Sequence, residues 1–457
     1  MNSLLTNFHR RMSMSNKKVN PLKLYIVSVQ YPPHIFDIEG KIVNELASYL
    51  KRNGEEVNFC TLGIGDEIEE EKIYDPILGK KKDKNPLILL RFFAKDSKLI
   101  KNPYEGTKAE ELRRFSSISN PIAQFVGIQQ GIIHLHGNNA IPFISKIIKE
   151  DLYLVDETGS RKKIISTFYD LESYYLKTDP NVNTKILKEI QEMESLSFKF
   201  SDKIVVNRIF IKNLLKEIMK KDFEDEKIFL IPIPVNQDFI ENDYNNSNSL
   251  LEYREKLAIW KDSKLISMFI SSDQEFGLEL LLNNIEKILF KMKNKFSIII
   301  SIDNFKDQDL FNKISRTIGD LNKQDNIQIL ILDLKDKEEK IKVLDDSEFY
   351  IAPSNKEKYD INILEAWARK KAVIAFNTQS NLELFGIDEI TDQLNETDLG
   401  ILIDINDNSV DLLEKSINIL LNDSQKSKLM GENGKKRVTN NYTWDKFISK
   451  YYEIYKN

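Results

Sequence analysis

Short apolar runs alternate with helical stretches along the whole chain. The runs are rich in Ile, Leu, Val and Phe, a pattern typical of strands that are covered on both faces. A first series of strands is predicted at residues 23–29, 57–62, 132–135, 163–167, 203–206 and 228–231. A second series is predicted at residues 264–269, 296–300, 327–332, 349–352, 372–376 and 400–403. Alternation of strands with helices implies parallel pairing, so the sequence predicts two doubly wound, Rossmann-like α/β domains facing across a cleft.

Polar segments interrupt the alternation of predicted strands and helices. The Asn-rich segment 236–249 lies between the two strand series and is interpreted as an interdomain linker. It divides the chain into an N-terminal domain over 20–238 and a C-terminal domain over 239–439. Residues 1–19 are polar and basic without an apolar centre, which predicts a flexible tail and not a secretory signal. The mixed-charge segment 65–86 is expected to be a solvated loop.

Composition excludes several classes of protein. The 457 residues carry a formal net charge of -5, so no basic field suggests a nucleic-acid partner. The lone cysteine, Cys60, rules out an internal disulfide and fits a reducing compartment, so a cytoplasmic protein is expected. No apolar run approaches the roughly 20 residues of a membrane-spanning helix, although peripheral membrane contact stays open.

The strongest chemical signal is the segment Glu357-Lys-Tyr-Asp-Ile-Asn-Ile-Leu-Glu365. It follows a predicted strand and the turn Pro353-Ser354, and its second half reads as a helix. One carboxylate would therefore lie on the loop at the carboxyl end of the strand and the other in the adjoining helix, at the edge where doubly wound sheets bind ligands. By its spacing alone, the pair would be interpreted as an exposed loop Glu and a helix-surface Glu. In this context it resembles the Glu-x7-Glu motif of retaining glycosyltransferases of the family 4-like, glycogen-synthase-like type, which have the GT-B fold.

This resemblance implies roles for several residues. Glu357 would lie by the donor sugar as a catalytic residue, and Glu365 would bind the hydroxyls of the nucleotide ribose. The pair His134-Leu-His136 resembles the family's His-x-His, which makes His136 the catalytic counterpart near the reacting sugar. Two histidines at this spacing could also bind a metal, but no further ligand pattern completes a zinc site.

The resemblance also implies a donor pocket in the C-terminal domain and an acceptor site in the N-terminal domain. Gly40 matches one glycine of a pair that lets the backbone approach the donor, while Glu39 fills the other position. The further candidates are the backbone at Asp360 and Ile361, Ser271 and Glu383. The Tyr-rich end of the chain, residues 440–457 with Trp444, resembles terminal helices that pack back on the N-terminal domain.

The chain departs from the family where the donor diphosphate is held. The family has an Arg and a Lys at the positions of Ser271 and Phe276, and those cations offset the charge of the leaving group. Asp360 stands where the family has a glycine, and Tyr169 replaces a histidine. Compensating cations could come from Lys356, Lys358 or Arg369, but a solvated charged face is the favoured interpretation of these residues.

Two functions follow. The first is a retaining glycosyltransferase that uses a nucleotide-diphosphate sugar as co-substrate, an unknown acceptor, and no metal or other cofactor. The second is a weakly active or inactive relative that serves as a binding or regulatory subunit, with an active transferase as partner. A sugar-phosphate epimerase or phosphorylase on the same fold has no feature in its favour. The donor base, the sugar, the acceptor and the oligomeric state are not encoded in any recognisable pattern.

Overall fold

The structure is a computed structural model of the chain, and it forms two compact units. The first unit comprises Met1–Val205, Lys216–Phe229 and Ile454–Asn457, and the second comprises Val206–Leu215 and Leu230–Glu453. The residues that the structure describes are 21–28, 31, 38–63, 69–73, 83, 85–93, 119–127, 129–137, 162–178, 183–241, 247–271, 276–289, 295–303, 308–322, 325–334, 336–388 and 393–457.

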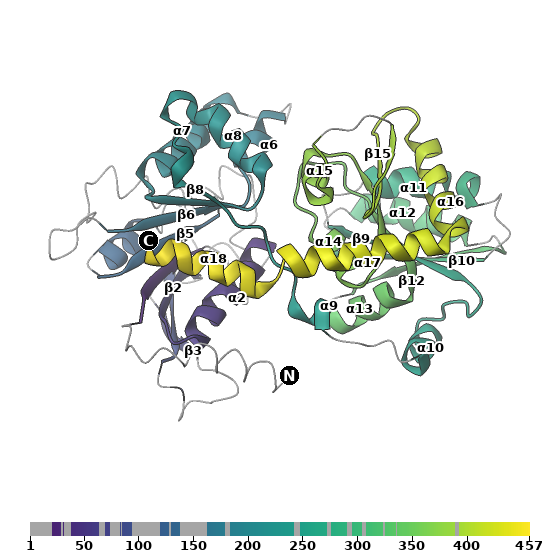
Figure 1. Ribbon diagram of the computed structural model, residues 1–457, viewed down its shortest axis with the longest axis horizontal. Coiled ribbons are helices and arrows are strands. Elements are labelled where there is room, and N and C mark those ends of the chain that lie inside the picture. Colours follow the sequence, from purple (N-terminus) through teal and green to yellow (C-terminus); the bar gives the residue numbers. More distant parts are fainter. Residues whose placement is uncertain are drawn as a thin grey trace. The chain divides into compact units, whose positions relative to one another are not determined.

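The first unit is built on a sheet with strand order β3-β4-β2-β1-β5-β6-β7-β8 (Figure 1). Its strands are β1 Lys23–Val27, β2 Glu56–Gly63, β3 Glu69–Ile73, β4 Leu87–Phe93, β5 Ile132–His136, β6 Ile164–Phe168, β7 Lys203–Val206 and β8 Ile228–Leu230. Strand β1 pairs in parallel with β2 on one side and with β5 on the other, whereas β3 is antiparallel to β4. The strand order therefore reverses at β1 and β5, which makes their carboxyl ends the switch point of this sheet.

The second unit repeats the plan with the order β11-β10-β9-β12-β13-β15-β14. Its strands are β9 Lys264–Ser271, β10 Phe296–Asp303, β11 Ile327–Leu332, β12 Ser347–Ala352, β13 Ala372–Phe376, β14 Leu394–Glu396 and β15 Gly400–Ile403. Without the antiparallel edge strand β14, this is the 3-2-1-4-5-6 order of a Rossmann sheet. The switch point lies between β9 and β12.

Helices connect the strands in both units. The labelled helices of the first unit include α2 Ile38–Arg52, α6 Glu172–Thr178 and α7 Thr184–Phe200, and residues 119–127 are also helical. Helix α8 Ile209–Met219 begins in the second unit and ends in the first. The second unit has α9 Gln237–Glu241, α10 Ser247–Lys256, α11 Phe276–Leu289, α12 Gln308–Leu321, α13 Lys337–Asp346, α14 Ile361–Ala368, α15 Gln379–Phe385, α16 Ser409–Asn422 and α17 Ser424–Asn441. The final helix, α18 Trp444–Lys456, starts in the second unit, and its last turn belongs to the first.

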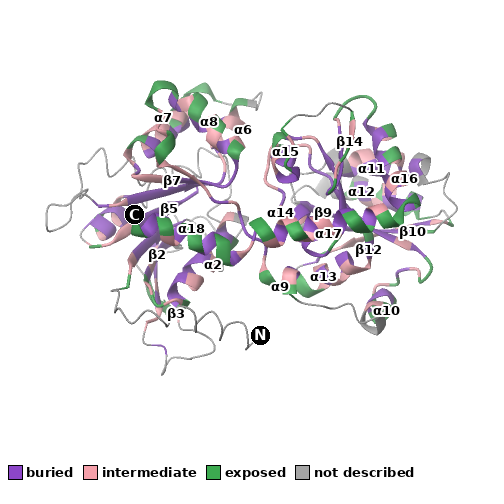
Figure 2. Cartoon of the chain, in the orientation of Figure 1, coloured by how far each residue is buried: buried purple, intermediate pink, exposed green. Residues whose placement is uncertain are grey.

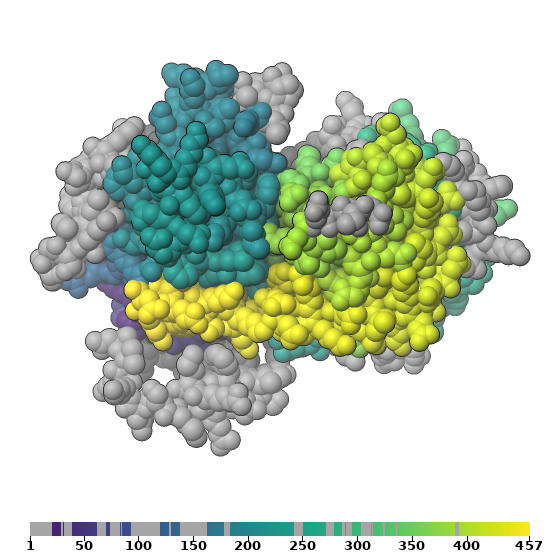
Figure 3. Space-filling view, turned by 45° about the horizontal axis from the view of Figure 1, so that its top comes forward, coloured from purple at the N-terminus to yellow at the C-terminus, as the bar shows by residue number. Residues whose placement is uncertain are grey.

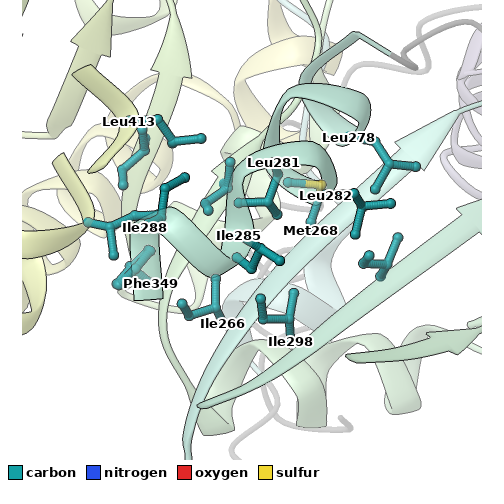
Figure 4. Close-up of a cluster of buried hydrophobic side chains, with 14 of the residues drawn as sticks. Ile266, Met268, Leu278, Leu281, Leu282, Ile285, Ile288, Ile298, Phe349 and Leu413 are labelled. Carbon is teal, nitrogen blue, oxygen red and sulfur yellow. The ribbon is translucent and has the colours of Figure 1, made fainter. Parts of the chain in front are cut away.

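The second sheet is buried on both faces because its strands alternate between two cores (Figure 2). Ile266 and Met268 point to one face, where α11 covers them with Leu278, Leu281, Leu282 and Ile285 (Figure 4). Leu265 and Phe269 point to the other face, which α13 and α14 cover. Because successive side chains of a strand face opposite ways, continuous apolar runs are what a sheet covered on both faces requires.

Helix α17 approaches α14 more closely than side chains normally allow. A Cβ atom at Gly431 would lie 1.9 Å from the carbonyl oxygen of Lys370, and one at Gly434 would lie 2.4 Å from the Trp367 ring. Both glycines are therefore required by the packing of α17 on α14 and Trp367. The other side of α17 is exposed, and Figure 3 shows this part of the chain, in yellow, at the surface of the second unit.

The predicted fold class, two Rossmann-like α/β domains, is confirmed. Two local predictions are corrected. The segment 236–249 is not simply a linker, because α9 and the start of α10 lie in it. The segment 65–86 contains β3, whose charged sequence is tolerated because it forms the edge of the sheet. Among the described residues, no helix combines the length and apolar character needed to cross a bilayer.

Candidate active site

The candidate site lies at the switch point of the second sheet, where β12 ends at Ala352 and α14 begins at Ile361. Asp360 is the N-cap of α14: its Oδ1 accepts hydrogen bonds from the backbone N–H and the side-chain amide of Asn362, each at 3.0 Å. An N-cap carboxylate fits here because the free N–H groups and the dipole of a helix favour negative charge at its start. The sequence therefore places the positive end of α14 at the edge where ligands bind.

Asp360 differs from an ordinary cap in its burial. It is 2% exposed, and among the described residues its second oxygen, Oδ2, has no hydrogen-bond partner. Burial raises the pKa of the Asp360 carboxyl to about 6, because the charged form is poorly solvated; the bonds from Asn362 and the charge of Lys340 act in the opposite direction. The site thus contains a buried carboxylate oxygen that can accept a hydrogen bond.

Glu365 lies in the second turn of α14 and is 9% exposed. Its Oε2 forms an ion pair with the Nζ of Lys340 on α13 at 2.5 Å. The same ammonium donates a hydrogen bond to Oδ1 of Asn362 at 2.7 Å and lies 4.9 Å from the centre of the Phe269 ring on β9. Lys340 was not predicted from the sequence, because nothing in the helix-like segment 337–346 distinguishes it from the solvated lysines beside it.

Glu357 lies in the loop before α14, but its carboxylate faces α15. Its Oε1 accepts a hydrogen bond from the backbone N–H of Gln379 at 2.9 Å, and its Oε2 accepts one from the N–H of Ser380 at 3.0 Å. The next N–H of this helix, that of Asn381, donates to Oγ1 of the N-cap residue Thr378. Glu357 therefore satisfies the first-turn N–H groups that Thr378 leaves open.

Within the second unit, side chains of Arg208 and Glu383 connect the start of α8 to α15 and to the loop that carries Glu357. The guanidinium of Arg208 donates to Ser380 Oγ and, at 3.1 Å, to the carbonyl oxygen of Glu357. In return, the carboxylate of Glu383 accepts hydrogen bonds from the N–H groups of Ile209 at 2.7 Å and Phe210 at 3.3 Å. Arg208 is 1% exposed and was another residue that sequence reasoning missed. The predicted donor-binding Glu383 thus contacts the start of α8 in this structure.

The remaining predicted residues of the second unit occupy different places. Ile361 is the first residue of α14 and packs with the core on that face, and Ser271 is the last residue of β9. Arg369 follows the carboxyl end of α14, roughly 12 Å along the axis from its start. Its guanidinium binds Asp345 through two bonds of 2.7 Å, so it supports the fold there. Lys356 is exposed in the loop beside Glu357.

His136 ends β5, at the switch point of the first sheet, and both histidines of the predicted pair are 0% exposed. Its Nδ1 lies 3.2 Å from the Tyr169 hydroxyl, and its Nε2 lies 3.2 Å from Nδ1 of His134. His134 in turn contacts the hydroxyls of Tyr455 at 2.7 Å and Thr167 at 2.8 Å. Burial lowers the pKa of His136 to about 3, so its imidazole is neutral near pH 7.

Gly40 is buried in the first turn of α2, beside the half-buried Glu39. The Glu39 carboxylate lies directly against Gly137, the residue after His136: a Cβ atom on Gly137 would be within 1.9–2.3 Å of it. Gly137 has φ +75°, which also favours glycine. The carboxylate that replaces a glycine of the family is therefore packed against the end of β5.

Comparisons with known proteins agree with this architecture. Residues 251–437 match the profile of the family described as glycosyl transferases group 1. The fold is similar to sucrose-phosphate synthase from Thermosynechococcus elongatus, with a TM-score of 0.68, 16% identity, and coverage of 95% of this chain and 98% of that one. It is also similar to a glycosyltransferase from Rickettsia africae, with a TM-score of 0.65, 19% identity and coverage of 96% and 98%.

A third similar structure is Anabaena HepE in complex with UDP, with a TM-score of 0.64, 11% identity and coverage of 95% and 99%. Comparison with curated protein sequences gave no match. The chain nevertheless has the GT-B fold, and the match to the profile of glycosyl transferases group 1 lies within its second unit. It is thus an enzyme of the glycosyltransferase class, as the Glu-x7-Glu pair indicated.

Proposed function

We propose that the protein is a retaining glycosyltransferase that takes a sugar from a nucleotide-diphosphate sugar. The acceptor would be a glycan, a lipid or a small molecule, and no metal or other cofactor would take part. One observation carries the proposal: Asp360 and Glu365 lie within the first turns of α14, at the β9/β12 switch point of the domain that matches the family. HepE complexes with UDP-glucose, on the same fold, support a nucleotide-sugar donor.

In this proposal the nucleotide binds the second unit at the carboxyl edge of its sheet. Glu365 accepts hydrogen bonds from the two ribose hydroxyls. The start of α14 faces the diphosphate, where the helix dipole offsets negative charge on the leaving group. The N–H groups of Asn362 and Ile363 already bind Asp360, so the helix would act mainly through its dipole and its first residue.

Glu357 orients the donor sugar in this proposal. Its carboxylate now binds the N–H groups of Gln379 and Ser380, which are the groups that a sugar hydroxyl or a phosphate oxygen would also seek. His136 is fully buried, so its part would be to hold the Tyr169 hydroxyl in place and not to transfer a proton. Retention requires that the new bond form on the face from which the diphosphate leaves.

A binding or regulatory subunit is the second candidate, and one observation favours it. The carboxylates of Glu357 and Glu383 both cap helices, and Ser271 and Phe276 stand where the family has its diphosphate-binding cations. A protein of this kind would bind a nucleotide sugar without turnover, or bind none.

A thermal-shift panel of nucleoside diphosphates and nucleotide sugars tests the proposal. A ligand at about 100 times its dissociation constant stabilises the folded state by ~2.7 kcal/mol, which is readily measured. The ligand that shifts the unfolding temperature is then incubated with the protein and a mixture of sugar acceptors, and release of nucleoside diphosphate is followed. Binding with release supports the transferase, binding without release supports the subunit, and the absence of binding to every nucleotide overturns the transferase.

A further inference from the structure

The Lys340 ammonium is held in place by partners from three elements. It pairs with Glu365 Oε2 at 2.5 Å and donates to Asn362 Oδ1 at 2.7 Å, both on α14. Its ammonium also lies 4.9 Å from the ring of Phe269 on β9 and 5.9 Å from the ring of Phe239 on α9. Two aromatic faces and two oxygens therefore define a single position for the charge.

The position of the Lys340 ammonium affects the charge and the orientation of the Glu365 carboxylate. A carboxylate in a site that is largely shielded from water needs a counter-charge or donors to stay ionised and oriented. Lys340 uses Oε2 of Glu365, which leaves the other carboxylate oxygen to accept from a ligand. The side chain of Lys340 is 17% exposed and that of Glu365 is 11% exposed, so the pair lies at the margin of the interior.

The charges of Asp360, Glu365 and Lys340 also favour a hydroxyl group as the ligand of Glu365. Asp360 and Glu365 bring two carboxylates to the start of α14, and the Lys340 ammonium acts on both of them. Lys340 offsets one of these two negative charges and so lowers the repulsion of an anionic nucleotide. Glu365 then presents a carboxylate oxygen, an acceptor that suits hydroxyl groups better than phosphate.

We propose that Lys340 is a positioning residue of the nucleotide site, which acts through Glu365 to present its carboxylate to the ribose hydroxyls. This inference rests on the proposed function, and it adds a residue that neither the Glu-x7-Glu spacing nor the family resemblance identified. Lys340 does not touch the phosphates in this assignment. Its contribution therefore depends on the ribose diol and on the presence of Glu365.

The test is a double-mutant cycle measured by calorimetry with the nucleoside diphosphate that binds wild type best, taken from UDP, ADP and GDP. Lys340→Met and Glu365→Gln are each expected to weaken binding by about tenfold, equivalent to ~1.4 kcal/mol. Because Lys340 acts through Glu365, the double variant should bind about as well as Glu365→Gln alone. Losses that simply add would overturn the proposal, since they would mean that Lys340 contacts the ligand independently.

The 2′,3′-dideoxy form of the same diphosphate gives a second readout. It lacks the two hydroxyls, so wild type and Lys340→Met should bind it with equal, weakened affinity; a difference between them would overturn the assignment. Lys340→Arg should retain most of the affinity for the normal diphosphate. The matched control is Lys342→Met on the same helix, whose lysine pairs with Glu338, and it should leave binding unchanged.

These outcomes are separate from failure of the proposed function. If wild type binds no nucleoside diphosphate, both the transferase proposal and the positioning role of Lys340 are refuted. If wild type binds and Lys340→Met binds equally well, only the role of Lys340 falls. Thermal unfolding of each variant without ligand shows whether a loss of binding reflects loss of the fold.

Discussion

The carboxylate of Glu357 accepts a hydrogen bond from the backbone N–H of Ser380 at 3.0 Å, so the first acid of the Glu-x7-Glu pair is tied to the start of α15. A helix start is a site for anions, whether a side chain or a ligand supplies the charge. The contribution of this contact to the free energy of unfolding can therefore be measured apart from any role of Glu357 in sugar transfer.

Replacing Glu357 should separate these two roles. Glu357→Ala removes acceptors from two N–H groups and should lower the free energy of unfolding by ~1–2 kcal/mol. Glu357→Gln keeps one oxygen and should lose ~0.3–1 kcal/mol, mainly through the helix dipole. Urea unfolding measures both variants, with the exposed Lys356→Ala as control. If Glu357→Gln is as stable as wild type and transfers sugar at the wild-type rate, the carboxylate has neither role.

Asp360 should make stability depend on pH. Burial raises its pKa from 3.8 to about 6, so between these values the folded state binds a proton that the unfolded state releases. The contribution of Asp360 to the free energy of unfolding should therefore fall as pH rises from about 4 to about 6 and stay level above. Asp360→Asn keeps an oxygen for Asn362 without the charge, and should be more stable than wild type at pH 8 by ~1–3 kcal/mol but not at pH 4. Unfolding curves at both pH values check this, with the exposed Asp407→Asn as control.

The strands were largely predictable because a buried parallel strand leaves an unbroken apolar run. The ranges predicted at 203–206, 327–332, 372–376 and 400–403 coincide with β7, β11, β13 and β15. Three strands were missed: β4 Leu87–Phe93, although it is an apolar run, the short edge strand β14, and the edge strand β3, whose three glutamates an edge exposed to water accepts. Helix α9 and the start of α10 were missed because the segment 236–249, in which they lie, is rich in Asn and reads as a loop.

The candidate site was only partly predictable. The spacing of Glu357 and Glu365 points to one edge of a sheet, and both lie around the start of α14. Nothing in the sequence indicated Lys340, which contacts Glu365 from another helix. A contact between residues far apart in the chain produces no recognisable motif in a single sequence. The burial of His136 was also unpredicted, since an alternating His-Leu-His segment reads the same whether its strand lies inside or at an opening.

The histidine pair should weaken the fold in acid. Burial lowers the pKa of both imidazoles below the ordinary 6.5, to about 3 for His136. At these two residues the unfolded chain therefore binds protons that the folded chain does not, and their contribution to the free energy of unfolding should fall as pH drops from 6.5 toward 3. Imidazole NMR shifts of His134 and His136 should stay constant between pH 8 and pH 5, while those of the urea-unfolded chain titrate near 6.5. Titration of His136 in the folded protein above pH 5 would contradict this.

Glu365→Ala should weaken nucleoside diphosphate binding by ~1–3 kcal/mol, because two hydroxyl groups lose their acceptor. The variant also leaves Lys340 without its ion-pair partner, so its stability must be measured alongside. Calorimetry gives the affinity, and the control is Glu339→Ala on α13, which removes an exposed ion pair with Lys256 on α10. Equal affinities of wild type and Glu365→Ala would remove this residue from the binding site.

Restoring the family's cations tests whether the site already has enough positive charge. The double variant Ser271→Arg and Phe276→Lys places both cations at the positions where the family has them. A transferase in which α14 and its surroundings already offset the diphosphate should gain less than about tenfold in kcat/KM, since a second set of charges adds little to a neutralised leaving group. An inactive relative with an intact pocket should instead acquire nucleotide-sugar binding or hydrolysis that wild type lacks. Binding calorimetry and diphosphate release, measured on wild type and on the double variant, distinguish these results. If wild type is inactive and the double variant shows measurable turnover, the result contradicts the transferase proposal and favours the binding subunit.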